Sequence, residues 1–162
     1  MPLYAVNPNV FGSSAGGHLA STLATHFKDI SKIGDNKDAF SVVPNFTVLV
    51  SPVISFGKYT HEGSLKNFLG DHINKETIHE YSNEFHVSEH TPPTILFHAQ
   101  NDTSVHPMNS ILFYQEMIRN SVEGALHIFP KGGHSIGIYN KSELTDLWKN
   151  ICHEWLKEIK II

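Results

Sequence analysis

The sequence predicts an α/β fold with a mostly parallel sheet flanked by helices, and three observations support this. Short apolar runs of strand length alternate with longer segments whose apolar residues recur every three or four positions. The length suits a single domain, so we treat residues 1–162 as one unit. Hydrophobic residues make up 40% of the chain and charged residues 17%, which argues against intrinsic disorder and against a coiled coil.

The first half of the chain predicts one helix and one buried strand. Residues 16–27 carry a leucine or phenylalanine at every fourth position, beside two alanines, which is the apolar stripe of a helix. Residues 46–50 form an apolar run that a serine and a proline close, as in a buried strand. Residues 55–91 are polar and lack a sustained period. We expect them to form a cap or insertion outside the core, with a short helix near residues 75–81.

The second half alternates strands and helices. Residues 94–98 follow two prolines and predict a second buried strand. Residues 125–129 are a candidate for a third strand. One helix is expected at 107–120, where a proline suits the first position, and another at about 143–159, with Ser142 as its N-cap. The expected buried stripes are Met108, Ile111, Leu112 and Ile118 in the former, and Leu144, Leu147, Trp148, Ile151, Trp155 and Ile159 in the latter.

Composition argues against several classes of function. The formal net charge is −4 and only one arginine is present, so we expect no nucleic-acid partner. The apolar runs fall far short of the ~20 residues that cross a membrane, so we expect no membrane partner. The chain has twelve histidines at irregular spacings and a single cysteine, Cys152, so we expect neither a metal site nor an internal disulfide. No signal-peptide pattern opens the sequence, and the native compartment is left open.

The strongest functional motif lies directly before the first predicted helix. Residues 12–16 read Gly-Ser-Ser-Ala-Gly and fit the pattern G-x-S-x-G. In such a sharp strand-to-helix turn, small neighbours relieve the strained backbone of the central serine, here Ser14. The backbone N–H of Ala15 would then face a developing oxyanion, and the helix N-terminus would add positive potential. A glycine- and serine-rich loop that merely caps a helix is the alternative interpretation.

A carboxylate and a histidine follow later strands in the order that such a serine requires. Asp102 comes four residues after the strand at 94–98, and His134 lies in a glycine-rich loop after the strand at 125–129. Taken alone, Asp102 could form an Asx-turn or a helix cap, and His134 could be one surface histidine among twelve. Their order and their positions after strands favour a catalytic triad with Ser14.

The chain resembles α/β-hydrolase esterases of the branch that includes acetyl-xylan esterases and related carbohydrate esterases. The segment Phe11–Ser21 resembles the nucleophile segment of that branch, and Pro44–Val53 resembles its next strand. Residues Pro92–Pro107 resemble its acid loop with the preceding strand, and Gly132–Gly137 resembles its histidine loop. The similarity covers nearly the whole chain in matching order.

The resemblance assigns a role to each of these side chains. It implies that Ser14 is the nucleophile, His134 the general base and then acid, and Asp102 the carboxylate that orients His134. Ala15 would supply one oxyanion N–H, and no metal or organic cofactor is expected. The residues expected to support this machinery are Gly12, Gly16, Gly17, His18 and Gly133.

The resemblance also implies that part of the family's domain is lacking. It covers only the C-terminal half of that domain, without its first four strands and without the loop that supplies a second oxyanion N–H. The strand before the serine looks short, because Asn7–Asn9 leaves only Val10 and Phe11 ahead of Gly12, unless Leu3–Val6 replaces it. We therefore expect an N-terminally truncated domain that either forms homo-oligomers through an uncovered sheet edge or folds poorly. Its activity is expected to be reduced unless a partner chain completes it.

The leading hypothesis is a serine hydrolase that cleaves carboxylic esters through an acyl-enzyme intermediate. The resemblance suggests a small ester or an acylated carbohydrate as substrate, for example acetyl groups on xylan. Within the same class, a peptidase or a lactone hydrolase is the alternative. The alternative from another class is a catalytically impaired remnant that only folds and self-associates.

Overall fold

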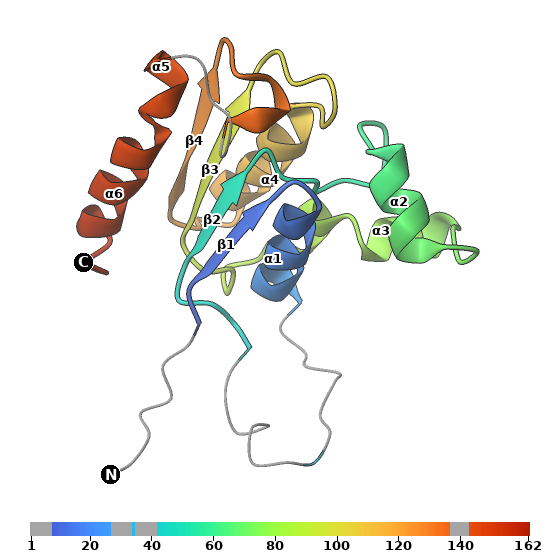
Figure 1. The fold of residues 1–162 in the computed structure, drawn as a ribbon. Helices are drawn as coiled ribbons and strands as arrows, with labels where there is room; N and C mark the ends of the chain where they lie inside the picture. Colours follow the sequence, from blue (N-terminus) through green and yellow to red (C-terminus); the bar gives the residue numbers. More distant parts are fainter. Residues whose placement is uncertain (1–7, 27–33, 35–41, 137–142) are drawn as a thin grey trace.

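A parallel four-stranded sheet forms the centre of the protein (Figure 1). The structure, a computed structural model, describes residues 8–26, 34, 42–136 and 143–162. The strands lie in the order β1-β2-β3-β4, and each pairs with its neighbour in parallel. The predicted α/β class and the three predicted strands are confirmed; β2 and β3 are buried as expected, whereas most residues of β4 are only half-buried. The strand bounds are β1 Val10–Ser13, β2 Thr47–Val50, β3 Thr94–Ala99 and β4 Gly124–Phe129.

The strand before the nucleophile is longer than the sequence predicted. β1 has four residues, and each of them pairs with a residue of β2, from Val10 opposite Thr47 to Ser13 opposite Val50. The segment considered as its substitute, residues 3–6, lies outside the described residues. All four strands run in the same direction, so the loops that follow them meet at one edge of the sheet.

Helices cover both faces of the sheet (Figure 1). Helices α1 (Ala15–Thr25) and α4 (Met108–Arg119) pack on one face, where Leu49 and Leu96 are fully buried. Helix α6 (Trp148–Glu158) packs on the other face through its two tryptophans. The strand residues alternate between the two cores, as period-two side chains must.

The predicted apolar stripes of helices α1 and α4 are wrong in part. In α1, Leu19 is 64% exposed, whereas the small residues Ala20 and Ala24 are fully buried, because the helix lies close against the sheet. In α4, Ile118 is 63% exposed and Phe113 and Met117 form the buried face. The polar side chains that share this buried face of α4 have hydrogen-bond partners from distant segments, which compensates for their burial.

The C-terminal helix is divided into two. Helix α5 (Glu143–Asp146) is short, and α6 begins after Leu147. Trp148 and Trp155 are buried as predicted, but Leu144 and Leu147 are 52% and 45% exposed, which corrects that part of the stripe. The predicted cap, Ser142, lies outside the described residues.

Residues 55–91 form a helical segment beside α1 (Figure 1). It contains α2 (Glu62–Leu69), α3 (Lys75–Glu80) and a 3₁₀ turn, η2 (Asn83–His86). The leucines of α2 pack into a small separate core that includes Val53, Phe56 and Val105. Of the helices that the structure describes, none is long and apolar enough to cross a membrane.

Candidate active site

Ser14 lies at the turn between β1 and α1 in a strained backbone conformation. Its φ angle is +54°, in the left-handed region that side chains other than glycine rarely adopt. Two hydrogen bonds hold the turn: Ser14 N–H donates to Val50 O at 3.2 Å, and Val53 N–H donates to Ser14 O at 3.0 Å. Ala15 is the first residue of α1, so its N–H has no acceptor within the helix. The turn therefore presents a hydroxyl beside a free amide.

Three glycines surround Ser14, and close packing requires a glycine at two of these three positions. A Cβ on Gly12 would lie 2.5 Å from Gly16 O, and a Cβ on Gly17 would lie 2.6 Å from the Cβ of Pro52. A Cβ on Gly16 would meet no atom within 4 Å. Gly12 and Gly17 therefore allow α1 to approach β1 and the end of β2, whereas space does not require Gly16.

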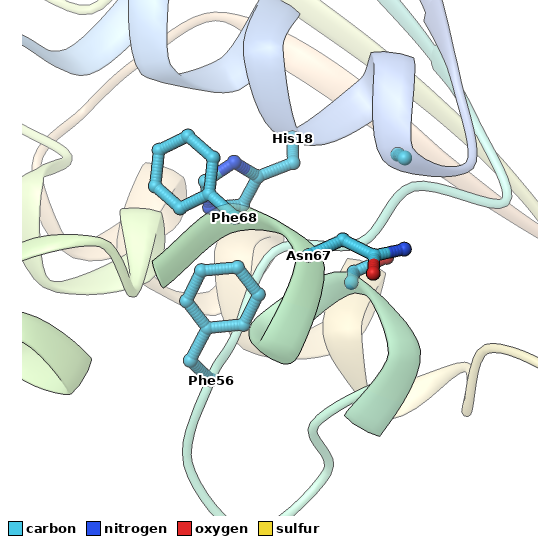
Figure 2. A pocket seen from close by; sticks show the side chains of 6 residues that line it. His18, Phe56, Asn67 and Phe68 are labelled. Carbon is cyan, nitrogen blue, oxygen red and sulfur yellow. The ribbon is translucent and has the colours of Figure 1, made fainter. Parts of the chain in front are cut away.

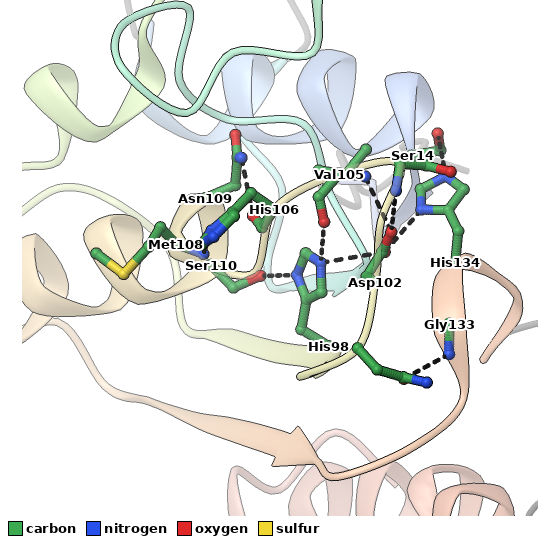
Figure 3. Close-up of polar contacts among 12 residues, drawn as sticks. Ser14, His98, Asp102, Val105, His106, Met108, Asn109, Ser110, Gly133 and His134 are labelled. Atoms are coloured by element: carbon green, nitrogen blue, oxygen red, sulfur yellow. Dashed lines mark hydrogen bonds and ion pairs between the residues drawn. The ribbon is translucent and has the colours of Figure 1, made fainter.

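The structure brings the three predicted catalytic side chains together (Figure 3). His134 Nε2 lies 2.8 Å from Ser14 Oγ, and His134 Nδ1 lies 2.8 Å from Asp102 Oδ2. A carboxylate oxygen only accepts, so Nδ1 carries the proton and Nε2 is free to accept the proton of the serine hydroxyl. The Asp102 side chain is completely buried and that of His134 is 29% exposed. These distances are those that a serine nucleophile, a histidine base and an orienting carboxylate require.

Asp102 is held as an anion by the loop in which it lies. Its Oδ1 accepts hydrogen bonds from the backbone N–H groups of Ser104 and Val105, each at 2.9 Å. Burial alone would raise the pKa of Asp102. Hydrogen bonds from His98, His134 and these two amides outweigh burial and hold the pKa of Asp102 well below its ordinary value.

The loop that carries His134 depends on two consecutive glycines. Gly132 has a φ angle of +143° and Gly133 a φ angle of +57°, both of which favour glycine. A Cβ on Gly132 would also lie 2.5 Å from Cγ2 of Ile136. Gly133 opens a single 3₁₀ turn, Gly133–Ser135, that contains His134. The tight turn thus directs His134 back toward Ser14.

Two supporting residues could not be found from the sequence. His98 lies in β3 with its side chain fully buried and 3.3 Å from Asp102 Oδ2. Asn109 is buried in α4, and its Oδ1 accepts from the N–H groups of Ile54 and Ser55 at 2.9 Å, which fixes the chain after β2. Their contacts join segments distant in sequence, so no local pattern signals them.

A pocket of about 240 Å³ opens beside the nucleophile turn (Figure 2). Its lining residues are Ala15, His18, Phe56, Ser64, Asn67 and Phe68. The imidazole of His18 stacks on Phe56, with ring centroids 4.6 Å apart, and its Nε2–H donates to Tyr81 O at 2.8 Å. His18 therefore supports the wall of the pocket and joins α1 to residues 55–91. Burial lowers the pKa of His18.

No cluster of three or more histidine, cysteine or acidic side chains that could hold a metal ion occurs in the described part of the chain. Cys152 is a half-buried free thiol on α6, and burial raises its pKa.

A serine elbow after a parallel strand, followed by a carboxylate and a histidine on the loops after later strands, is characteristic of α/β hydrolases. The sheet and its flanking helices are those of this fold. The model of the prolyl oligopeptidase family matches residues 7–159, and the chain belongs to that family.

Relatives of the chain include enzymes that act on xylan. It is 33% identical to an acetylxylan esterase of Xylanibacter ruminicola over 97% of this chain and 32% of that protein. It is 32% identical to endo-1,4-β-xylanase B of Butyrivibrio fibrisolvens over 81% of this chain and 21% of that protein. The chain thus spans about a third or less of these two relatives.

Solved structures give the same fold. An acetyl ester-xyloside bifunctional hydrolase from Caldicellulosiruptor lactoaceticus superposes with a TM-score of 0.89 at 38% identity, covering 95% of this chain and 57% of that one. A carboxylesterase from Lactobacillus plantarum superposes with a TM-score of 0.76 at 21% identity, covering 95% of this chain and 59% of that one. The second likeness concerns the fold alone.

Proposed function

We propose that this chain carries the catalytic triad of a serine carboxylic-ester hydrolase that removes short acyl groups, above all acetyl, from xylan-type carbohydrate. The observation that carries the proposal is the continuous contact from Ser14 Oγ through the His134 imidazole to Asp102, with both distances at 2.8 Å. Nucleophile and base lie within hydrogen-bond reach, and a third group orients the base.

In the acylation half-reaction, Ser14 Oγ attacks the carbonyl carbon of the ester and gives its proton to His134 Nε2. The negative charge that develops on the carbonyl oxygen faces the N–H of Ala15 and the N-terminus of α1. The carbon–oxygen bond to the alcohol then breaks, and His134 donates its proton to the leaving oxygen. The free alcohol departs and the acyl group remains on Ser14.

In the deacylation half-reaction, a water molecule attacks the acyl carbon and gives its proton to His134 Nε2. The bond to Ser14 Oγ breaks, Ser14 recovers the proton from His134, and the carboxylic acid leaves. Asp102 keeps its negative charge throughout, because its hydrogen bonds hold its pKa low against the effect of burial. It stabilises the imidazolium that forms twice in each cycle.

The carbohydrate ester is favoured by the relatives and by the pocket. Both xylan-related proteins and the bifunctional hydrolase carry xylan or xyloside in their names. The pocket beside Ala15 combines the apolar rings of Phe56 and Phe68 with the polar side chains of Ser64 and Asn67. Such a mixture of ring faces and hydrogen-bonding groups suits part of an acylated sugar.

The family also includes peptidases, as its name states, so amide hydrolysis is the second candidate within the same chemistry. The same three side chains would act on a peptide bond after proline. A lactone hydrolase would use them in the same way. Parallel assays with a proline-containing chromogenic amide and with a lactone separate these activities from ester hydrolysis.

The decisive experiment compares hydrolysis of p-nitrophenyl acetate by the wild-type chain and by Ser14→Ala. We expect Ser14→Ala to lower the hydrolysis rate by a factor on the order of 10³ or more. The remaining rate is the background that surface histidines give with an activated ester. Release of acetate from acetylated xylan, measured on the same two proteins, then tests the carbohydrate substrate.

Covalent labelling of Ser14 gives a control that needs no turnover. An organophosphate ester that phosphorylates active serines should attach one phosphoryl label per wild-type chain and none to Ser14→Ala, as mass spectrometry measures. Equal hydrolysis rates together with no labelling would contradict the proposal and would favour an impaired remnant of a hydrolase.

A further inference from the structure

His98 lies directly behind the catalytic carboxylate and has no role in the mechanism described so far. It is the fifth residue of β3 (Thr94–Ala99), and its side chain is fully buried at the end of the strand that leads into the loop of Asp102. Figure 3 shows its ring between α4 and this loop, on the side of Asp102 away from Ser14. A buried imidazole is costly unless both of its nitrogens have partners.

Both ring nitrogens of His98 have partners, and these determine its tautomer. Nε2 lies 2.9 Å from Val105 O and 3.3 Å from Asp102 Oδ2, two oxygens that can only accept. Nε2 therefore carries a proton and shares it between the two. Nδ1 lies 2.8 Å from Ser110 Oγ, whose hydroxyl can donate to it. The neutral Nε2–H tautomer thus satisfies every contact.

These contacts place His98 and His134 on the same carboxylate oxygen. Asp102 Oδ2 faces His134 Nδ1 at 2.8 Å and His98 Nε2 at 3.3 Å, whereas Oδ1 faces two backbone amides. The carboxylate is therefore held on all sides, and its orientation toward His134 is fixed. Val105 takes part twice, because its N–H donates to Asp102 and its carbonyl accepts from His98.

We propose that His98 is a positioning residue of the triad: its Nε2–H ties Val105 O and Asp102 Oδ2 together and so fixes the carboxylate against His134. The proposal rests on the proposed serine-hydrolase function. His98 touches neither Ser14 nor any reacting atom, so it acts on the reaction only through Asp102. The hydrogen bond from His98 is also among the interactions that lower the pKa of Asp102 against burial.

A simpler role for His98 would be to join β3 to α4 through Ser110. The two roles use different nitrogens of the ring. Substitution by two amide side chains of different length therefore distinguishes one role from the other. In His98→Gln the side-chain amide reaches the position of Nε2, beside Val105 and Asp102. In His98→Asn the shorter amide reaches only the position of Nδ1, beside Ser110. His98→Phe keeps a buried ring without any donor.

The experiment measures kcat and KM for p-nitrophenyl acetate with these three variants of the 162-residue chain, after Ser14→Ala background subtraction. We expect His98→Phe and His98→Asn to lower kcat roughly tenfold or more with KM unchanged, as loss of a group that orients a catalytic residue does. His98→Gln should retain a larger part of kcat. Ser110→Ala, which leaves the Nε2 contacts in place, should stay close to the wild type.

A spectroscopic readout tests the contact without turnover. The proton on His134 Nδ1, between imidazole and carboxylate, gives a far-downfield proton resonance, which His134→Gln identifies by its loss. We expect this resonance to move upfield in His98→Phe and His98→Asn and to stay near its wild-type position in His98→Gln. A destabilised control, Phe97→Leu, alters the core beneath the sheet without touching Asp102 and should leave the resonance unchanged.

The outcomes separate the proposals. Unchanged kcat in all three His98 variants would overturn the positioning role, and so would equal losses in His98→Gln and His98→Asn or a resonance that does not move. If His98→Phe does not fold, the two amide variants decide. If the wild type shows no activity that depends on Ser14, the proposed function fails, while the resonance still tests whether His98 fixes Asp102 against His134.

Discussion

Asn101 and Gly133 join the two loops that carry Asp102 and His134. Gly133 N–H donates to Asn101 Oδ1 at 2.9 Å, and each residue is the immediate chain neighbour of a triad member, Asp102 in one loop and His134 in the other. One hydrogen bond thus connects the loop after β3 to the loop after β4 next to the proposed catalytic side chains. The relative position of Asp102 and His134 is therefore set by the backbone as well as by their own contact.

Removing this bond should weaken the triad without destroying it. We expect Asn101→Ala to lower kcat a few-fold and to reduce the free energy of unfolding by about 0.5–1.5 kcal/mol, the net value of one such hydrogen bond. Asn101→Asp keeps an acceptor oxygen at the same place and should stay closer to the wild type. Esterase kinetics and urea unfolding test this, and identical behaviour of the two variants would contradict the role of the acceptor.

The neighbouring glycines of the elbow should respond in opposite ways to the same substitution. In Gly17→Ala the new Cβ meets Pro52, so α1 must shift away from the end of β2, and we expect a loss of stability and of activity. In Gly16→Ala the Cβ meets open space in the first turn of α1, and we expect a change between zero and ~1 kcal/mol of stabilisation. Urea unfolding of the two variants measures both effects, and equal destabilisation would show that the packing against Pro52 is unimportant.

The Asp102 carboxylate should make stability depend on pH. Its pKa is lower in the folded protein than in the unfolded chain, so its contribution is fully present above the unfolded pKa of about 4 and is lost as the pH falls through the folded pKa. We therefore expect the stability difference between the wild type and Asp102→Asn to stay constant from pH 6 to about 4 and to shrink as the pH falls below about 4. Urea unfolding at several pH values measures this.

The exposed residue Asp71 provides the matched control for this pH dependence, because Asp71→Asn changes the net charge equally. A stability difference between the wild type and Asp102→Asn that stays constant across the acid range would contradict the lowered pKa. In the catalytic assay, Asp102→Asn should lower kcat by a factor on the order of 10⁴, because an asparagine favours the wrong tautomer of the histidine.

The sequence predicted the order of the elements better than it predicted their faces. The strands at 46–50 and 94–98 were recognised because strands covered on both faces require continuous apolar runs. The helix at 62–69 was not, because only Leu65 and Leu69 of this polar segment are buried and its N-cap is a histidine, His61.

In the candidate site, too, residues with a local sequence pattern could be predicted, whereas a residue defined only by tertiary contacts could not. Ser14, Asp102 and His134 could be found because each follows a strand, and parallel strands bring their carboxyl ends to one edge of the sheet. His98 could not, because a histidine within an apolar run is indistinguishable from an ordinary core residue. The role of His98 depends on its contacts with Val105 and Ser110, which lie near it only after the loop of Asp102 and α4 have folded.

The last prediction concerns β1, which lies at the edge of the sheet among the described strands. Phe11 on this strand is 56% exposed, and Leu19 on α1, the helix that follows the strand, is 64% exposed. Unpaired strand edges with apolar neighbours favour pairing with another chain. We propose that two copies of the 162-residue chain associate through this edge.

Light scattering after size-exclusion chromatography over a range of protein concentrations tests the association. We expect a mass that rises with concentration for the wild type, and a shift toward the 18.2 kDa monomer for Phe11→Lys, because a lysine on an edge strand opposes pairing. Ile118→Lys adds the same charge at a 63% exposed position on α4 and should leave the mass unchanged. A monomer at every concentration, or equal shifts in the two lysine variants, would show that the β1 edge does not hold the copies together.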